Sequence, residues 1–232
     1  MRTVFVALCI AFCIRAQDPY AVAGNHYRML LENDWVRVSL VSYGPHESTP
    51  VHDHSATPTA IYVYLTDAGP LRFKHMTGMK VAGEVVTRPA VKAGEIRLGH
   101  SAPETHSTEY LGDAPMKYLR IELRTEVPEA VVRNVRIQPP AMERNRTAVL
   151  NEFENGQVRI LRVICARGDV CPASQHPDDP ALEAVMSGPE QAAPEQAGPD
   201  QAGMLRWCPA AEKGPVDAVR LEFKTEPVRQ SK

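Results

Sequence analysis

Residues 44–54 read GPHESTPVHDH and end in two histidines, His52 and His54, that are separated by one aspartate. In a β-strand, side chains two residues apart point to the same side, so both imidazoles would face one point. Imidazole binds Zn, Fe, Ni, Cu and Mn, which makes the pair a candidate for part of a metal site. A chain with eight histidines in 232 residues also forms such a pair readily by chance. The surrounding sequence is therefore needed to interpret this histidine pair.

The segments around this stretch have the alternation that is typical of short β-strands. Residues 35–41 (WVRVSLV) place Val36, Val38 and Leu40 on one side and Arg37 and Ser39 on the other, which is a period of two. Further short apolar or alternating runs occupy residues 61–65, 71–73, 84–86, 96–98, 118–123 and 219–223. Glycines and prolines separate these runs, and the total of 20 prolines disfavours a helical bundle. We therefore expect an all-β sandwich or barrel.

A second segment of interest follows about forty residues after the histidine pair. Residues 92–98 (KAGEIRL) contain a turn and a short strand, and they are followed by Pro103 and His106. Segments 44–54 and 94–106 resemble the two sequence motifs of the cupin superfamily. The first segment has two extra residues between its glycine and its first histidine, and the second matches a looser common form of the second motif. The resemblance covers about residues 28–126 and, more faintly, residues 148–226.

The resemblance implies a double-stranded β-helix, or jelly-roll barrel, with a divalent metal ion (Fe, Mn, Zn, Ni or Cu) inside it. His52, His54 and His106 match the three histidine ligands of the family. The glutamate ligand of the family falls near position 58 or 59, where this chain has Pro58 and Thr59. Either three histidines hold the metal with positions open for water or substrate, or a residue of the flanking loops completes the set; a site that binds no metal is the alternative. The candidates for the additional ligand are Glu47, His46, His100 and Glu104.

The chain also repeats itself. Residues 30–60 align with residues 152–182 without gaps, and the segment RIELRTE (120–126) aligns with RLEFKTE (220–226). The order of the blocks is the same in both copies, which indicates a duplicated domain, resembling a bicupin, with a shortened second copy. In that copy His54 aligns with His176, whereas His52 aligns with Ser174. We expect no metal in the second copy, whose role would be to cover the first barrel.

These observations divide the chain into four parts. Residues 1–16 have the positive start and short apolar run of a secretory signal peptide, too short for a membrane span. The first cupin copy occupies residues 17–128, a linker residues 129–147, and the degenerate copy residues 148–232. Within the last part, residues 188–202 consist of three proline-containing pentads with no large apolar side chain, which predicts a flexible loop. We expect a secreted or periplasmic protein without a transmembrane segment in its mature chain.

Cleavage after residue 16 would leave three cysteines. Cys165 and Cys171 would form a disulfide if the compartment is oxidising, and the odd count leaves at least one unpaired thiol, for which Cys208 is a candidate. The sequence alone does not decide this pairing.

The charge balance bears on partners. The chain has 26 basic and 28 acidic residues and a net charge of −2, which disfavours a nucleic-acid partner. A small-molecule ligand or substrate is the partner that we expect, and a homodimer is one alternative for the assembly.

The sequence supports two alternative functions: a metal-dependent enzyme of the dioxygenase, isomerase or lyase type, or a non-catalytic ligand-binding or structural cupin protein. The sequence leaves the choice open, because the fold does not select the chemistry. His26 and His75 are expected at the surface.

Overall fold

The computed structural model describes residues 18–54, 59–77, 80–100, 104–127, 134–141, 146–172, 176, 178–187, 205–207 and 216–228. The predicted signal peptide (1–16), the pentad segment (188–202) and Cys208 lie outside these residues. The described part consists of one short helix, α1 (Pro19–Val22), and strands. No helix in it is long and apolar enough to cross a membrane. The strands are β1 (Tyr27–Glu32), β2 (Val36–Tyr43), β3 (His52–His54), β4 (Thr59–Tyr64), β5 (Leu71–Thr77), β6 (Lys80–Arg88), β7 (Ile96–His100), β8 (Glu104–Tyr110), β9 (Met116–Leu123), β10 (Val135–Ile137), β11 (Ala148–Glu154), β12 (Val158–Cys165), β13 (Ala181–Ser187), β14 (Leu205–Trp207) and β15 (Val216–Phe223).

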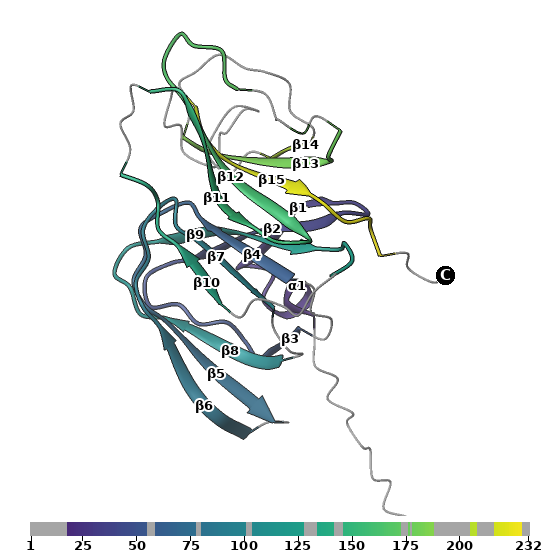
Figure 1. Ribbon diagram of the computed structural model, residues 1–232. Coiled ribbons are helices and arrows are strands. Elements are labelled where there is room, and N and C mark those ends of the chain that lie inside the picture. Colours follow the sequence, from purple (N-terminus) through teal and green to yellow (C-terminus); the bar gives the residue numbers. More distant parts are fainter. Residues whose placement is uncertain are drawn as a thin grey trace, which may run out of the picture.

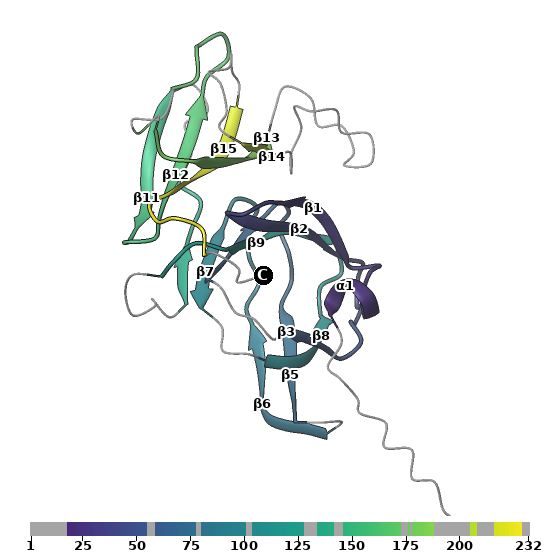
Figure 2. The same cartoon turned by 90° about the vertical axis from the view of Figure 1, so that its right-hand side faces the viewer.

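The strands form three sheets (Figures 1 and 2). A six-stranded sheet in the order β1-β2-β9-β4-β7-β10 and a four-stranded sheet in the order β3-β8-β5-β6 face each other and enclose a barrel. The Tyr43 hydroxyl joins the two sheets through a hydrogen bond of 2.6 Å to Thr108 Oγ1. The third sheet, β11-β12-β15-β13-β14, lies against the outer face of the six-stranded one. The expected all-β, duplicated jelly-roll architecture is confirmed.

Strand pairing shows that the duplication is structural. In the first copy, β2 pairs with β9 so that Val36 lies opposite Leu123. In the second copy, β12 pairs with β15 so that Val158 lies opposite Phe223. Both pairs occupy positions that the alignment of the sequence with itself makes equivalent. Among the described residues, the second copy has no counterpart of the four-stranded sheet, which agrees with a shortened copy.

The two faces of the six-stranded sheet differ in chemistry because side chains alternate along each strand. The outer face carries Val36 and Val38, as the sequence predicted, and packs on the third sheet in one core cluster. The other members of that cluster include Ile61, Val63, Leu119, Ile121, Leu123, Val158, Ile160, Leu182, Val219, Leu221 and Phe223. The inner face, toward the barrel interior, carries aromatic and polar side chains, among them Tyr43, Tyr64 and Tyr118. The second copy therefore covers one face of the first barrel.

One local feature supports the motif assignment. Gly94, which opens the second motif, has a φ of +82°, a conformation that favours glycine and turns the chain into β7.

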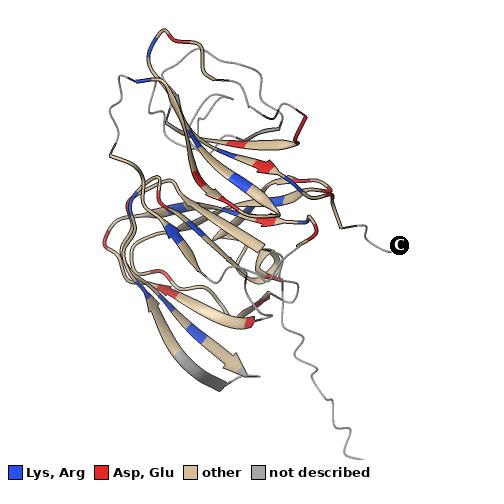
Figure 3. Cartoon of the chain, in the orientation of Figure 1, with Lys and Arg blue, Asp and Glu red and all other residues tan. Residues whose placement is uncertain are grey.

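The structure also pairs Cys165 with Cys171 in a disulfide, which the sequence left open. Basic and acidic residues are interspersed along the strands of both copies (Figure 3).

Candidate metal centre

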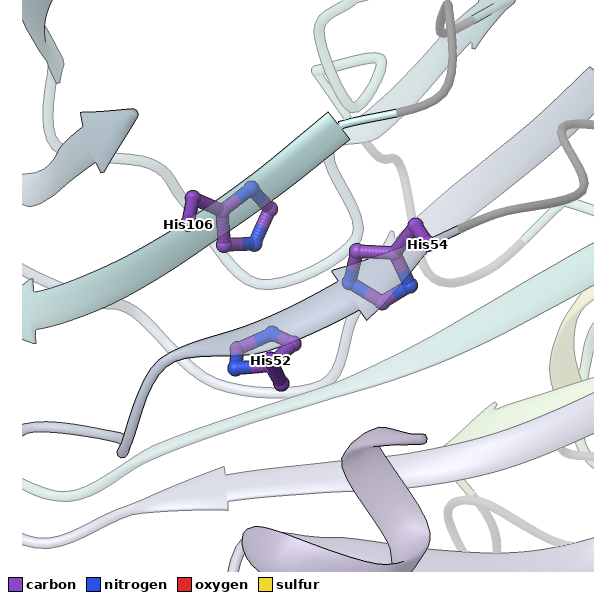
Figure 4. Close-up of side chains that lie close together, drawn as sticks. All are labelled: His52, His54 and His106. Carbon is purple, nitrogen blue, oxygen red and sulfur yellow. The ribbon is translucent and has the colours of Figure 1, made fainter. Parts of the chain in front are cut away.

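Three histidines from two neighbouring strands meet inside the barrel (Figure 4). His52 and His54 lie on β3 and His106 lies on β8, where it pairs directly opposite His52. All three are buried, with exposed fractions of 0%, 8% and 3%. One ring nitrogen from each lies within 4.8 Å of the others. The structure thus brings together the three residues that the sequence singled out.

The orientation of His52 is fixed by its neighbours. Its Nδ1 lies 2.9 Å from the carbonyl oxygen of Pro50, and because a carbonyl only accepts, Nδ1 carries the proton. Nε2 is then the nitrogen with a free lone pair, and the Tyr27 hydroxyl lies 3.4 Å from it. A hydrogen bond from the remote ring nitrogen to a backbone carbonyl is the usual support of a metal-binding histidine.

His106 provides the test of whether a cation fits here. Its Nδ1 is buried and has no hydrogen-bond partner among the described residues, and Glu104 Oε1 lies 3.4 Å from it. Buried polar atoms are rarely left without a partner. Three buried imidazoles and a nearby carboxylate form a donor set suited to a divalent transition metal. The residues present therefore fit such an ion.

Electrostatics keep two of these histidines neutral. Burial lowers the pKa of His52 to about 4, although the hydrogen bond to Pro50 opposes this shift. Burial also lowers the pKa of His54 to about 2, and the positive charge of Arg120 adds to the shift. Metal ions bind the neutral imidazole. Both side chains are therefore in the binding form at neutral pH.

Cross-strand register adds two further groups to the cluster. Glu104 lies opposite His54, and His75 of β5 lies opposite His106. Glu104 Oε2 is 3.4 Å from His75 Nδ1, so the carboxylate lies between two imidazoles. Glu104 is the first residue of β8, not part of a loop as the sequence suggested. His75, Glu104 and His106 also have donor atoms within 4.8 Å of one another.

His75 and His26 were expected at the surface, and the structure leaves both only partly exposed. The side chain of His75 is 32% exposed, and it points to the same side as Phe73, which is buried. The period of two that starts at Phe73 was the available signal for this orientation. His26 is 12% exposed, and its Nδ1 lies 2.9 Å from the carbonyl oxygen of Ser42.

Two of the other candidate ligands, His46 and Glu47, have partners outside the cluster. His46 is 64% exposed and bonds Asp113. Glu47 accepts a hydrogen bond of 2.6 Å from the backbone N–H of Gly44, so it closes the turn before β3. The side chain of His100 lies outside the described part. Thr59, at the position of the family glutamate, donates to Gln157 Oε1 at 2.8 Å.

Comparisons with solved structures show which known folds the chain resembles. No family model and no curated protein sequence matches the chain. Among solved structures, YhaK from Escherichia coli matches 92% of this chain and 99% of its own, with a TM-score of 0.56 and 11% identity. The bacterial pirin YhhW from Escherichia coli, solved in complex with nickel(II), matches 88% of this chain and 97% of its own, with a TM-score of 0.50 and 11% identity. The chain has a bicupin fold.

A third solved structure matches over most of both chains. AerE from Microcystis aeruginosa covers 85% of this chain and 96% of its own, with a TM-score of 0.53 and 12% identity. The bicupin fold agrees with the motif resemblance in segments 44–54 and 94–106. At these identities the comparisons establish the fold, and the residues of the site carry the functional argument.

Proposed function

We propose that this bicupin binds one divalent metal ion through His52, His54 and His106 in its first barrel. The observation that carries the proposal is the convergence of three buried imidazoles, each with a ring nitrogen within 4.8 Å of the others. Glu104 is the candidate for the additional ligand, because its Oε1 lies 3.4 Å from His106 Nδ1. The nickel(II) complex of the pirin YhhW supports a metal in a barrel of this fold.

The donor set indicates a divalent transition metal ion. Three imidazoles and a carboxylate suit Fe, Mn, Zn, Ni and Cu. When bound, such a metal supplies a Lewis acid that polarises a coordinated oxygen. The protein would contribute aromatic side chains beside the metal, among them Phe73. The ring centroids of Phe73 and His106 lie 5.4 Å apart.

We further propose that the metal site acts on a small molecule, as a dioxygenase, isomerase or lyase type of enzyme. The alternative is a non-catalytic protein that holds a small ligand or the metal alone. The Cys165–Cys171 disulfide supports an oxidising compartment, and with the predicted signal peptide it favours a secreted or periplasmic location. A homodimer stays a prediction, for which light scattering after size-exclusion chromatography is the measurement.

The test is metal content of the purified protein, measured by inductively coupled plasma mass spectrometry after expression with added Fe, Mn, Zn, Ni and Cu. We expect about one equivalent in the wild type. His52→Ala removes the ligand whose orientation is fixed by Pro50, so it should lower the bound metal at least tenfold while circular dichroism still reports the β fold. His46→Ala, whose side chain is exposed, is the control and should retain the metal. A metal-free wild type in every medium would overturn the proposal.

A further inference from the structure

A buried tyrosine meets the candidate metal centre from the other sheet of the barrel. Tyr27 is the first residue of β1, an edge strand of the six-stranded sheet, and His52 is the first residue of β3, an edge strand of the four-stranded sheet. The two edges are in contact here, because the ring centroids of Tyr27 and His52 lie 5.6 Å apart in an edge-to-face arrangement. Tyr27 is 6% exposed and belongs to the apolar cluster of the barrel interior.

The surroundings of Tyr27 hold its ring in place. Its backbone N–H donates to the carbonyl oxygen of Ala23 at 3.1 Å, and its backbone pairs with Val41 of β2. The Tyr20 ring of α1 packs edge-on against it, with the two ring centroids 6.0 Å apart. These contacts keep the Tyr27 hydroxyl at its position beside His52.

The distance between Tyr27 and His52 distinguishes two roles for this hydroxyl. Its oxygen lies 3.4 Å from His52 Nε2, the nitrogen that has the free lone pair. Direct hydrogen bonds between oxygen and nitrogen are usually no longer than about 3.2 Å. Two donor atoms that each bind one metal ion at about 2.0–2.1 Å, at the tetrahedral angle, lie about 3.3–3.4 Å apart. The observed separation therefore fits two ligands of one ion better than it fits a direct hydrogen bond.

The other donors of the cluster leave room for such an oxygen. The family glutamate is missing at positions 58 and 59. Glu104 contacts His106, whereas the Tyr27 hydroxyl contacts His52, so the two oxygen donors approach the cluster at different imidazoles. Tyr27 therefore adds an oxygen donor that does not compete with Glu104 for the same histidine.

We propose that Tyr27 is a further ligand of the metal ion and binds it through its phenolate oxygen, next to His52 Nε2. This inference rests on the proposed function, because it needs the metal at the three histidines. Phenolate oxygen is a known protein ligand of iron. Burial raises the pKa of Tyr27 well above its ordinary value, so the phenol keeps its proton in the metal-free protein. A bound cation acts in the opposite direction, as it does on water and on thiols, and the proton of the hydroxyl is released to solvent when the metal binds.

The test is the absorption spectrum of the full chain during titration with Zn²⁺ and, separately, with Cu²⁺. In the wild type we expect both ions to produce the ultraviolet difference spectrum of an ionised tyrosine, and Cu²⁺ to add a visible phenolate-to-copper charge-transfer band. Tyr27→Phe should lose both signals while it still binds the metal, with an affinity lowered by about tenfold or more. A tyrosine that only packs in the barrel would produce neither signal. The wild-type spectra test the inference without any variant, and circular dichroism checks that Tyr27→Phe keeps the β fold.

The matched control is Tyr43→Phe, which removes another buried hydroxyl close to Tyr27. The Tyr43 hydroxyl bonds Thr108 and no histidine of the cluster, so this variant should keep both signals. Metal bound by the wild type without either signal, or signals that persist in Tyr27→Phe, would overturn this inference and leave the proposed function standing. A wild type that takes up neither ion, measured by inductively coupled plasma mass spectrometry after dialysis, defeats the proposed function and this inference with it.

Discussion

His54 is the residue at which the requirements of the site oppose stability most strongly. It is 8% exposed, and burial holds its pKa at about 2, whereas an unfolded histidine has a pKa of about 6.5. His52, with a pKa of about 4, has the same conflict to a smaller degree. Below pH 6.5 the unfolded chain binds protons that the folded chain refuses, so acid favours unfolding. A bound metal would offset this penalty by stabilising the folded state, and it binds only the neutral imidazoles.

The free energy of unfolding of the metal-free protein should therefore depend on pH through these histidines. Their contribution is constant above about pH 6.5 and falls by about 1.4 kcal/mol per pH unit for each histidine below it. His52 contributes down to about pH 4 and His54 to about pH 2. Urea unfolding at pH 7, 6 and 5 measures the slope. His54→Gln should lose about half of this histidine contribution, and an unchanged slope in that variant would contradict the assignment.

At the scale of elements, strand β8 organises the site because it lies between β3 and β5. Its alternate residues Glu104 and His106 point inward, and the register brings His52 and His54 from one side and His75 from the other. Glu109 of the same strand is an odd number of residues away from Glu104 and His106, so its side chain points outward. Its carboxylate lies 2.8 Å from Lys74 Nζ. One strand thus separates the inner site from an outer ion pair.

This arrangement predicts different effects for two glutamates of one strand. Glu104→Gln removes the charge that faces His106 and His75 and should weaken metal binding about tenfold to a hundredfold. Glu109→Gln should leave metal affinity unchanged, since its partner Lys74 lies on the opposite face. Competition with a chromophoric chelator measures both affinities. Equal affinities in the two variants would show that Glu104 has no part in holding the metal.

At the scale of the whole molecule, the two copies share one apolar core. Residues such as Ile121 of the first copy and Leu221 of the second, both 0% exposed, belong to the same cluster. The ring centroids of Trp35 and Phe223 lie 5.9 Å apart across this interface. Neither face can be exposed to water without loss of hydrophobic stabilisation, so the copies should unfold together.

Leu221→Ala tests this coupling. The substitution leaves a cavity in the shared core and should lower the free energy of unfolding by about 2–5 kcal/mol. Both copies should be destabilised together. Tryptophan fluorescence and circular dichroism should therefore report one and the same unfolding transition. Leu150→Ala, at a position that is 38% exposed, should cost much less. Two separate transitions in Leu221→Ala would show that the copies fold independently.

Local periodicity explains how much of this molecule was predictable. The alternation in residues 35–41 predicted both the strand and its apolar face, and the spacing of His52 and His54 predicted that both point the same way. The repeated segments predicted the duplication, and β9 and β15 take equivalent places in the two copies, paired with β2 and β12 respectively. These features depend on side chains a few residues apart or on identity between two segments, which the sequence displays directly.

The positions of Glu104 and His75 beside the three histidines were decided only by the tertiary structure. Each acquires its position from a strand partner that is distant in the chain: His54 for Glu104 and His106 for His75. Cross-strand register is set by the packing of whole sheets, and a shift of one residue would turn every one of these side chains to the opposite face. The sequence by itself determined the strands, the duplication and the three histidines. The folded barrel decided which charges surround them, because only long-range pairing places those groups side by side.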